Sequence, residues 1–217
     1  MEHRGLIMAA TTYLSSFWDR IADRYAKRPV PDESIYQRKL AITRKFLRPG
    51  DTVLEVGCGT GTTAIHHAPN VSHIHATDIS ERMIEIARER ASETDLTNIT
   101  FEQAALEDLD LPMKSADVIL ALNLLHLVPD RHVAISILEG WLKPGGILVT
   151  STVCLGDNMR WFRYLAPIGR ALGLMPLVKI FDMADLRKDL TNAGFHQEVD
   201  WPTADGRTLF AVSRKPQ

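Results

Sequence analysis

Three glycines at alternate positions follow a short apolar run, residues 53–56, and no other part of this sequence suits ligand binding better. Gly57, Gly59 and Gly61 carry no Cβ, so the backbone of this turn is able to approach a ligand closely. A helix that starts after the turn directs unpaired N–H groups and its positive dipole end toward the same place. The pattern predicts a site for a small anionic group that belongs to a larger, flat molecule.

Two acidic residues beside this turn narrow the choice of ligand. Glu55 lies two positions before the first glycine, where it would repel a pyrophosphate and favour a cationic amino group. Thr62 stands where the nicotinamide-binding pattern G-x-G-x-x-G has its third glycine, which disfavours a nicotinamide oxidoreductase. Asp78 ends a second predicted strand, and a carboxylate there accepts both hydroxyls of a ribose. The sequence therefore favours a nucleoside that also carries an amino group.

The run Glu-Val-Gly-Cys-Gly-Thr-Gly at residues 55–61 resembles motif I of the class I S-adenosylmethionine-dependent methyltransferases. The resemblance covers residues 34–213 and implies S-adenosyl-L-methionine as the cofactor. It also implies a set of cofactor-binding residues from this motif, from later strand ends and from the N-terminal segment: Glu55, Gly57, Cys58, Gly59, Thr60, Gly61, Asp78, Ile79, Met83, Ala105, Leu106, Asn123 and Tyr25.

Within that set, the family resemblance implies a role for each strand end. Asp78 is expected to hold the ribose and Ile79 to lie against the adenine, with Met83 either beside it or in the core. The family often has an acid where this chain has Ala105, so backbone groups there would have to serve the adenine edge. Asn123 follows the fourth strand, where related enzymes hold the amino-acid end of the cofactor with backbone atoms.

The expected acceptor site draws on the same family. The segment Phe17 to Tyr25 is similar to the Trp-x-x-Ile-Ala-x-x-Tyr element that folds over the cofactor in many small-molecule methyltransferases. This similarity implies that Tyr25 closes the site and that Trp18 borders the acceptor, while a helix docked on the sheet is the alternative. His126 is a candidate general base, since imidazole titrates near neutral pH, or else a packing residue.

Alternating strand and helix signals predict the elements that position these residues, in a doubly wound α/β fold. Strands are expected at 52–56, 73–78, 99–103, 117–122, 147–153, 195–201 and 208–213, and helices at 34–47, 80–90, 130–142 and 184–193. This order is similar to the seven-stranded, mostly parallel methyltransferase sheet with its C-terminal antiparallel hairpin. Residues 1–33 would form an N-terminal helical cap, and residues 34–217 the S-adenosylmethionine-binding methyltransferase domain.

Residues 156–181 form an insertion that is rich in aromatic and aliphatic side chains and is interrupted by arginines and prolines. We interpret it as a helical lid over an apolar acceptor pocket, with Trp161 and Tyr164 contacting the acceptor. Three other interpretations stay open: a dimer interface, a contact with a membrane surface, or ordinary core packing.

Composition argues against several other classes of protein. The net charge of −2 does not favour binding to the phosphate backbone of nucleic acid. Residues 123–126 also lack the Pro-Pro-aromatic motif of nucleic-acid amino-methyltransferases. The paired histidines at 66–67 and 73–75 lack a third ligand at metal-binding spacing, so we expect no metal. We expect no transmembrane span and no signal peptide, and with only two cysteines we expect a cytoplasmic protein.

These features together predict methyl transfer from S-adenosylmethionine to a small, apolar or aromatic acceptor, by a monomer or homodimer. Two alternatives remain. One is a protein that binds S-adenosylmethionine without turnover, in a regulatory or assembly role. The other is a lipid methyltransferase that acts at the membrane surface. The motifs do not encode whether O, N, S or C accepts the methyl group.

Overall fold

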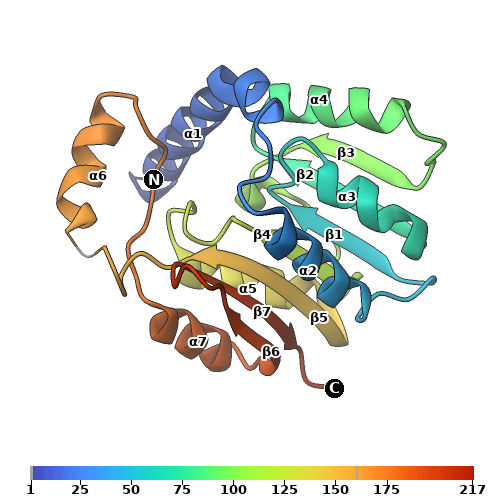
Figure 1. The fold of residues 1–217 in the computed structure, drawn as a ribbon. Coiled ribbons are helices and arrows are strands. Elements are labelled where there is room, and N and C mark those ends of the chain that lie inside the picture. The colour runs from blue at the N-terminus through green and yellow to red at the C-terminus, as the bar shows by residue number, and fades with distance from the viewer. Residues whose placement is uncertain (1, 160) are drawn as a thin grey trace.

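The structure, a computed structural model, describes residues 2–159 and 161–217, with side chains from residue 12 onward except at position 163. Its centre is a seven-stranded sheet with the strand order β3-β2-β1-β4-β5-β7-β6 (Figure 1). β7 runs antiparallel to both of its neighbours, and the remaining pairs are parallel. This confirms the predicted sheet. The strands are β1 (Thr52–Val56), β2 (His73–Asp78), β3 (Ile99–Gln103), β4 (Ala116–Leu122), β5 (Leu142–Val153), β6 (His196–Pro202) and β7 (Thr208–Arg214).

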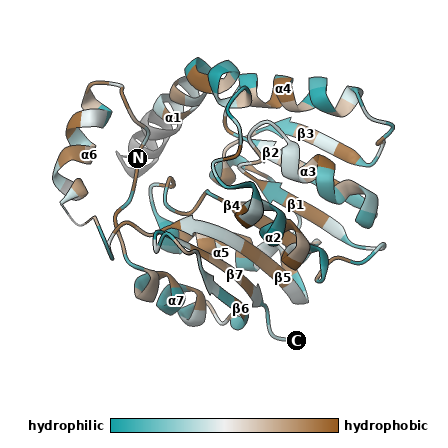
Figure 2. Ribbon diagram, viewed as in Figure 1, coloured by the Kyte–Doolittle hydropathy of each residue, from teal (hydrophilic) through white to brown (hydrophobic). Residues whose placement is uncertain are grey.

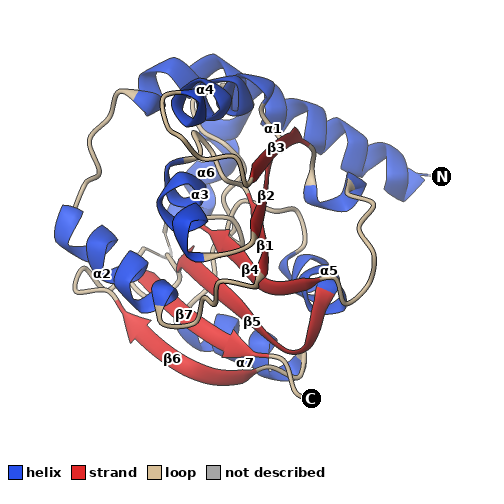
Figure 3. Cartoon of the chain, turned by 90° about the vertical axis from the view of Figure 1, so that its right-hand side faces the viewer, coloured by secondary structure: helices blue, strands red, loops and turns tan. Residues whose placement is uncertain are grey.

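Helices cover both faces of the sheet, because successive residues of a strand point to opposite faces. Val53 of β1 packs into the core shared with the helices at 33–44, 62–67 and 81–92, and Leu54 into the core shared with those at 131–141 and 183–192. Figure 3 shows helices on both sides of the sheet. Residues 118–121 of β4 are at most 1% exposed, which explains their all-apolar sequence. Figure 2 shows hydrophobic segments, coloured brown, in several strands of the sheet. The covering helices are α2 (Glu33–Arg44), α3 (Thr62–His67), α4 (Glu81–Ser92), α5 (Arg131–Trp141) and α7 (Met183–Asn192).

The predicted boundaries differ most at β5, which begins at Leu142 rather than Ile147. Leu142 pairs with Ala116, and the pairing then resumes at Ile147 opposite Val118. Pro144 cannot donate to a ladder and Gly145 has a φ of 76°, so the strand bulges between the two paired positions. The first predicted helix, 34–47, ends earlier than expected, at Arg44, and continues as a turn.

Two helices lie outside these layers, α1 (Glu2–Ala26) and α6 (Phe162–Ala171) (Figure 1). α1 packs on α4, where Ala22 contacts Met83 and Ile86. The lid predicted over 156–181 is helical only in α6, and the other described residues of the insertion form turns and extended segments. Gly173 follows α6 with a φ of 67°, a left-handed conformation that stops a helix. Residue 160 of the insertion lies outside the described residues.

His67, the last residue of α3, is a fully buried titratable group in this fold. Within the described part of the chain, neither ring nitrogen of His67 has a hydrogen-bond partner. Burial, followed by the neighbouring His66 and Arg44, lowers the pKa of His67 to about 4. The imidazole is therefore neutral in the native protein at pH 7.

We predict that His67 makes the protein less stable as the pH falls from 7 to 4. Its native pKa lies below the unfolded value, so the unfolded state binds more protons in this window and stability falls with pH. The loss through this residue should be about 2–3 kcal/mol, from a shift of about two pKa units. Urea unfolding at pH 7, 5.5 and 4.5 should show a shallower dependence for His67→Phe than for wild type. Identical slopes would contradict the prediction.

Candidate cofactor and acceptor site

The glycine loop, residues 57–61, leaves the carboxyl end of β1 and leads into α3. Its three glycines have φ values of 72°, 54° and 74°, all in the left-handed region that favours glycine. A Cβ on Gly61 would lie 2.8 Å from the Cβ of Ala87, so the third glycine lets the loop pack against α4. The turn thus lies between a strand and a helix, as the motif predicts, and α4 supplies a packing reason for its last glycine.

Asp78, at the end of β2, fastens this loop to the neighbouring strand. Its Oδ2 accepts the N–H of Gly59 at 2.8 Å, and its Oδ1 accepts the N–H of Ser80 at 2.9 Å. The carbonyl of Thr77 accepts the N–H of Gly57 at 2.8 Å. Burial raises the pKa of Asp78, and the two N–H donors oppose that rise. The acid predicted for the ribose thus lies beside the loop and orients it.

Glu55, near the end of β1, carries a buried carboxyl group that is 2% exposed. Its Oε2 has no hydrogen-bond partner among the described residues. Burial, and then the charge of Asp78, raise the pKa of Glu55 to about 8, so this group is largely protonated at pH 7. A buried polar group without a partner is costly, and a ligand that brings a cationic donor relieves that cost. The residues present therefore fit the amino group of S-adenosylmethionine.

Aromatic residues of α1 and α2 lie near these two acids. A Cβ on Gly59 would lie 4.0 Å from Cε1 of Tyr25, which places this ring over the loop. Trp18 packs edge-on against Tyr25, with ring centroids 6.3 Å apart. Burial and, to a smaller extent, the charge of Glu55 raise the pKa of Tyr36 on α2. The structure brings the predicted Tyr25 to the loop, with Trp18 packed against it, and adds Tyr36, which was not predicted from the sequence.

The turn after β4 meets the same loop. Asn123 has a φ of 56°, and its N–H donates to the carbonyl of Ser151 at 2.6 Å. A Cβ on Gly57 would lie 3.1 Å from Cδ1 of Leu124, so this leucine lies on the glycine loop. Lys39 of α2 donates to Ser151 Oγ at 2.9 Å and so brings a cation close to Asn123. Lys39 was not predicted from the sequence.

The turn after β3 lies beside the end of β2, as the predicted adenine edge requires. Gln103 Nε2 donates to the carbonyl of Ile79 at 3.3 Å, which joins the two turns. The side chains of Ala105 and Leu106 are buried, at 8% and 5% exposure. The carbonyl of Ala105 already accepts the N–H of Asp108 at 3.1 Å, so that backbone group is engaged within its own turn.

The other predicted cofactor residues occupy more enclosed positions. Met83 is 2% exposed and packs with Ala22 of α1, which favours its core alternative over a contact with adenine. Cys58 is buried within the loop. Thr60 is buried too, and its Oγ1 accepts a hydrogen bond from Arg90 at 2.6 Å.

The predicted acceptor residues are not brought together. His126 is 7% exposed, and burial lowers its pKa to about 4, so its imidazole is neutral at pH 7. Its carbonyl accepts the N–H of Lys179 at 2.8 Å, which joins the turn after β4 to the insertion. Trp161 and Tyr164 belong to the α6 segment and are 55% and 74% exposed. No described contact joins either of these two side chains to the glycine loop.

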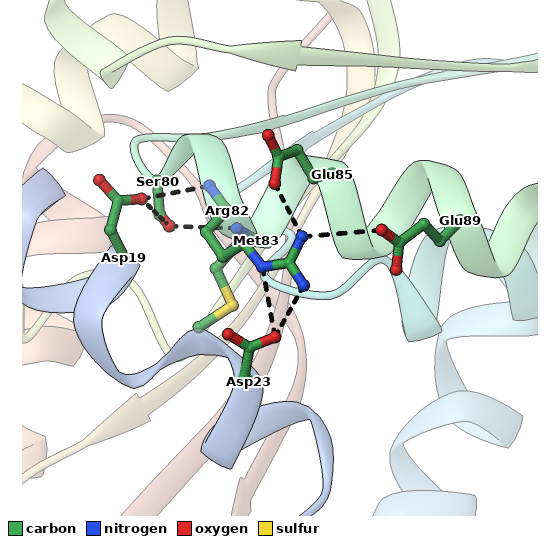
Figure 4. A network of polar contacts seen from close by, with 7 residues as sticks. All are labelled: Asp19, Asp23, Ser80, Arg82, Met83, Glu85 and Glu89. Atoms are coloured by element: carbon green, nitrogen blue, oxygen red, sulfur yellow. Dashed lines mark hydrogen bonds and ion pairs between the residues drawn. The ribbon is translucent and has the colours of Figure 1, made fainter.

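A polar cluster, the α1–α4 latch, joins Asp19 and Asp23 of α1 to Ser80 and Arg82 of α4 (Figure 4). Asp19 Oδ1 accepts the hydroxyl of Ser80 at 2.6 Å and the backbone N–H of Arg82 at 3.2 Å. Asp23 Oδ1 accepts a hydrogen bond from Nη2 of the Arg82 guanidinium at 2.8 Å. Ser80 caps α4 and bonds to Asp78, so the latch fastens α1 directly to the turn that holds the glycine loop.

Arg90 makes a second tie between α1 and the loop. Its guanidinium donates to the carbonyl of Ala26 at 2.8 Å, to Thr60 Oγ1 at 2.6 Å and to Thr62 Oγ1 at 2.9 Å. Neither Arg90 nor the latch was predicted from the sequence. The available signal was the spacing of Asp19, Ala22 and Asp23, which puts a small residue between two acids on one helix face.

We predict that Asp19→Ala loosens the C-terminal half of α1. The change leaves the Ser80 hydroxyl and the Arg82 N–H without their acceptor, and hydrogen bonds to a charged group contribute about 1.5–3 kcal/mol. Amide hydrogen exchange in α1 should therefore quicken by roughly tenfold or more. Asp23→Ala, which breaks only a solvent-exposed ion pair, is the matched control and should have a smaller effect. Equal exchange rates in wild type and Asp19→Ala would refute the latch.

The described side chains include no group of three His, Cys, Asp or Glu residues placed to hold a metal ion. Two of the histidines considered above instead contact β3, His75 through Glu102 at 2.8 Å and His73 through Thr100 at 3.1 Å. None of the helices in the described ranges is both long and apolar enough to cross a membrane.

Comparison with known proteins places this site in a family. A family model described as a methyltransferase domain matches residues 47–193. The 27-O-demethylrifamycin SV methyltransferase of Amycolatopsis mediterranei (strain S699) is 33% identical over 154 residues, which cover 70% of this chain and 56% of that protein. The demethylmenaquinone methyltransferase of Listeria monocytogenes serotype 4a is 30% identical over 138 residues, 58% of each chain. The alignments thus span little more than half the length of these curated relatives.

A solved structure gives the same picture of the fold. The S-adenosylmethionine-dependent methyltransferase from Mesorhizobium loti superposes with a TM-score of 0.65 at 22% identity, over 81% of this chain and 96% of its own. The region matched by the family model runs from before β1 to the end of α7 and so contains the glycine loop, Glu55 and Asp78. The chain belongs to the class I S-adenosylmethionine-dependent methyltransferase family.

Proposed function

We propose that this protein transfers the methyl group of S-adenosyl-L-methionine to a small-molecule acceptor. The observation that carries the proposal is the buried carboxyl of Glu55, whose Oε2 has no partner among the described residues, with the glycine loop and Asp78 next to it. These two acids suit the amino group and the ribose hydroxyls of a single ligand. Membership of the methyltransferase family supports the same reaction.

When bound, S-adenosylmethionine supplies a methyl group on a sulfonium, which makes it open to in-line displacement. The task left to the protein is to orient the two reactants, which contributes about 7–11 kcal/mol in favourable cases. In our proposal the glycine loop and Asp78 hold the nucleoside, and Glu55 holds the amino group. Tyr25 and Trp18, carried by α1, cover the loop and exclude water from it.

We propose an acceptor that is largely apolar or aromatic. The relatives are named for 27-O-demethylrifamycin SV and for demethylmenaquinone, which supports an organic molecule of this general kind. In this chain the acceptor would reach the turn at residues 123–126, which is joined to the insertion through the His126 carbonyl and the Lys179 N–H.

Calorimetry and product analysis together test this function. S-adenosylmethionine and its demethylated product should both bind, and a methylated product should form from at least one member of a panel of hydroquinones, phenols and amines. Binding without any methylated product would favour a regulatory or assembly role instead. Binding of NAD in place of S-adenosylmethionine would overturn the cofactor assignment.

We predict that S-adenosylmethionine binding at pH 7 releases close to one proton from Glu55. The raised pKa keeps this carboxyl protonated in the free protein, and a cationic amino group beside it favours the ionised form. Calorimetry in buffers of different ionisation enthalpy measures the release directly. The release should vanish at pH 9 and in Glu55→Gln.

Glu55→Gln should also weaken cofactor binding by roughly ten- to a hundredfold, since a charge-assisted hydrogen bond contributes about 1.5–3 kcal/mol. An unchanged proton count in Glu55→Gln would remove Glu55 from the site. Glu102→Gln, on the exposed side of β3, is the matched control and should change neither quantity.

We predict that His126→Ala lowers kcat by roughly a hundredfold, the lower end of the range for general bases. The neutral imidazole has an Nδ1 without a partner among the described residues, and its low pKa makes it a weak base. The dissociation constant of S-adenosylmethionine should stay unchanged. Near-normal turnover in the variant would show that His126 only packs the turn after β4.

A further inference from the structure

The α6 segment presents an apolar stripe to solvent. Its members follow helical spacing along one face and are between 50% and 74% exposed: Trp161, Tyr164, Leu165, Ile168 and Leu172. Ala166, on another face of the same helix, is 8% exposed. A contiguous apolar patch that is exposed to solvent usually marks a site of contact with another molecule. The stripe therefore needs an occupant.

The C-terminal end of α6 and the turn after it are held against α1 by hydrogen bonds. The hydroxyl of Tyr13 donates to the carbonyl of Arg170 at 2.9 Å and to that of Met175 at 3.1 Å. Arg20 donates to the carbonyl of Gly173 at 2.5 Å. α6 accordingly stands at the edge of the molecule, beyond α1 (Figures 1 and 2). These contacts leave the apolar stripe uncovered.

The charge of the insertion points to the nature of the occupant. Residues 158–181 contain four basic residues, Arg160, Arg163, Arg170 and Lys179, and no acidic residue. Lys179 is exposed, and Arg20 adds a further exposed cation beside the end of α6. An apolar helix face in a segment whose charged residues between Asp157 and Asp182 are all basic is complementary to an anionic lipid surface, where acyl chains meet phosphate headgroups.

We propose that the outer face of α6 docks on the surface of an anionic lipid bilayer. The apolar stripe enters the boundary between headgroups and acyl chains, and the neighbouring cations contact lipid phosphates. A second copy of this chain is less well suited, because two such faces would bring like charges together with no acid to separate them. The docking does not depend on methyl transfer, so its test is independent of the proposed function.

Vesicles of phosphatidylcholine, with and without phosphatidylglycerol, provide the test. The full-length protein should sediment with the anionic vesicles, bind neutral ones weakly and be released by salt. Trp161 is the most exposed of the four tryptophans, so its emission should shift to the blue on binding, and Trp161→Phe should lose that shift. Absence of sedimentation with anionic vesicles overturns the proposal.

Variants identify the surface. The double variant Leu165→Ser/Ile168→Ser changes side chains that are 50% and 57% exposed, and should weaken vesicle binding at least about tenfold without loss of thermal stability. Lys179→Gln should weaken binding to anionic vesicles by roughly fivefold. Val133→Ser on α5 also changes an exposed apolar residue, at 49%, and should have no effect.

Two other results would replace the bilayer with another occupant. A wild-type dimer that becomes monomeric in Leu165→Ser/Ile168→Ser, without vesicle binding, would assign the stripe to a second copy. A raised KM for the acceptor in this variant, again without vesicle binding, would assign α6 to a lid. Vesicle binding that the double variant leaves unchanged would place any membrane contact elsewhere on the protein.

Discussion

The carboxylate of Asp78 bonds at once to the N–H of Gly59 and to the N–H of Ser80, and so joins the glycine loop after β1 to the helix start after β2. Each bond satisfies a backbone donor at a strand end, where the regular ladder has stopped. The Thr77 carbonyl completes the link by accepting the N–H of Gly57. The shape of the loop is therefore set by the neighbouring strand as much as by its own glycines.

The N-terminal helix α1 is hydrogen-bonded to the residues that shape the glycine loop. Asp19 bonds to Ser80, the residue whose N–H Asp78 accepts, and Arg90 bonds to both Ala26 and Thr60. The apolar contact of Ala22 with Met83 and Ile86 lies between these two ties. α1 is thus placed over the loop by contacts to the same elements that shape the loop, and Tyr25 comes to lie beside Gly59.

Much of the fold could be predicted from the sequence, because the decisive signals are local. The apolar run of β4 and the glycines after β1 specify buried strands and a tight turn without knowledge of the rest of the chain. The boundary of β5 could not be predicted, since its extension past Pro144 depends on pairing of Leu142 with Ala116. The insertion was expected to be more helical than it is.

The residues of the candidate site also fall into two groups, those with a local sequence signal and those placed by packing. Glu55, Asp78 and the glycine loop lie within one motif and its following strand, so the resemblance and the spacing of that motif predicted them. Lys39, Tyr36 and Arg90 reach the site from helices whose packing no local pattern reveals. Trp161 and Tyr164 were predicted to contact the acceptor because the insertion is rich in aromatic residues. In the structure both side chains are exposed in the α6 region.

The double role of Arg90 has a kinetic consequence. One guanidinium holds the last turn of α1 and the hydroxyl of Thr60, so swinging the helix aside also frees the backbone beneath it. Entry and departure of a nucleoside would then share a single rate-limiting motion of the N-terminal helix. In such an enzyme the residence time of the spent nucleoside would follow how often Arg90 and the α1–α4 latch release α1 together.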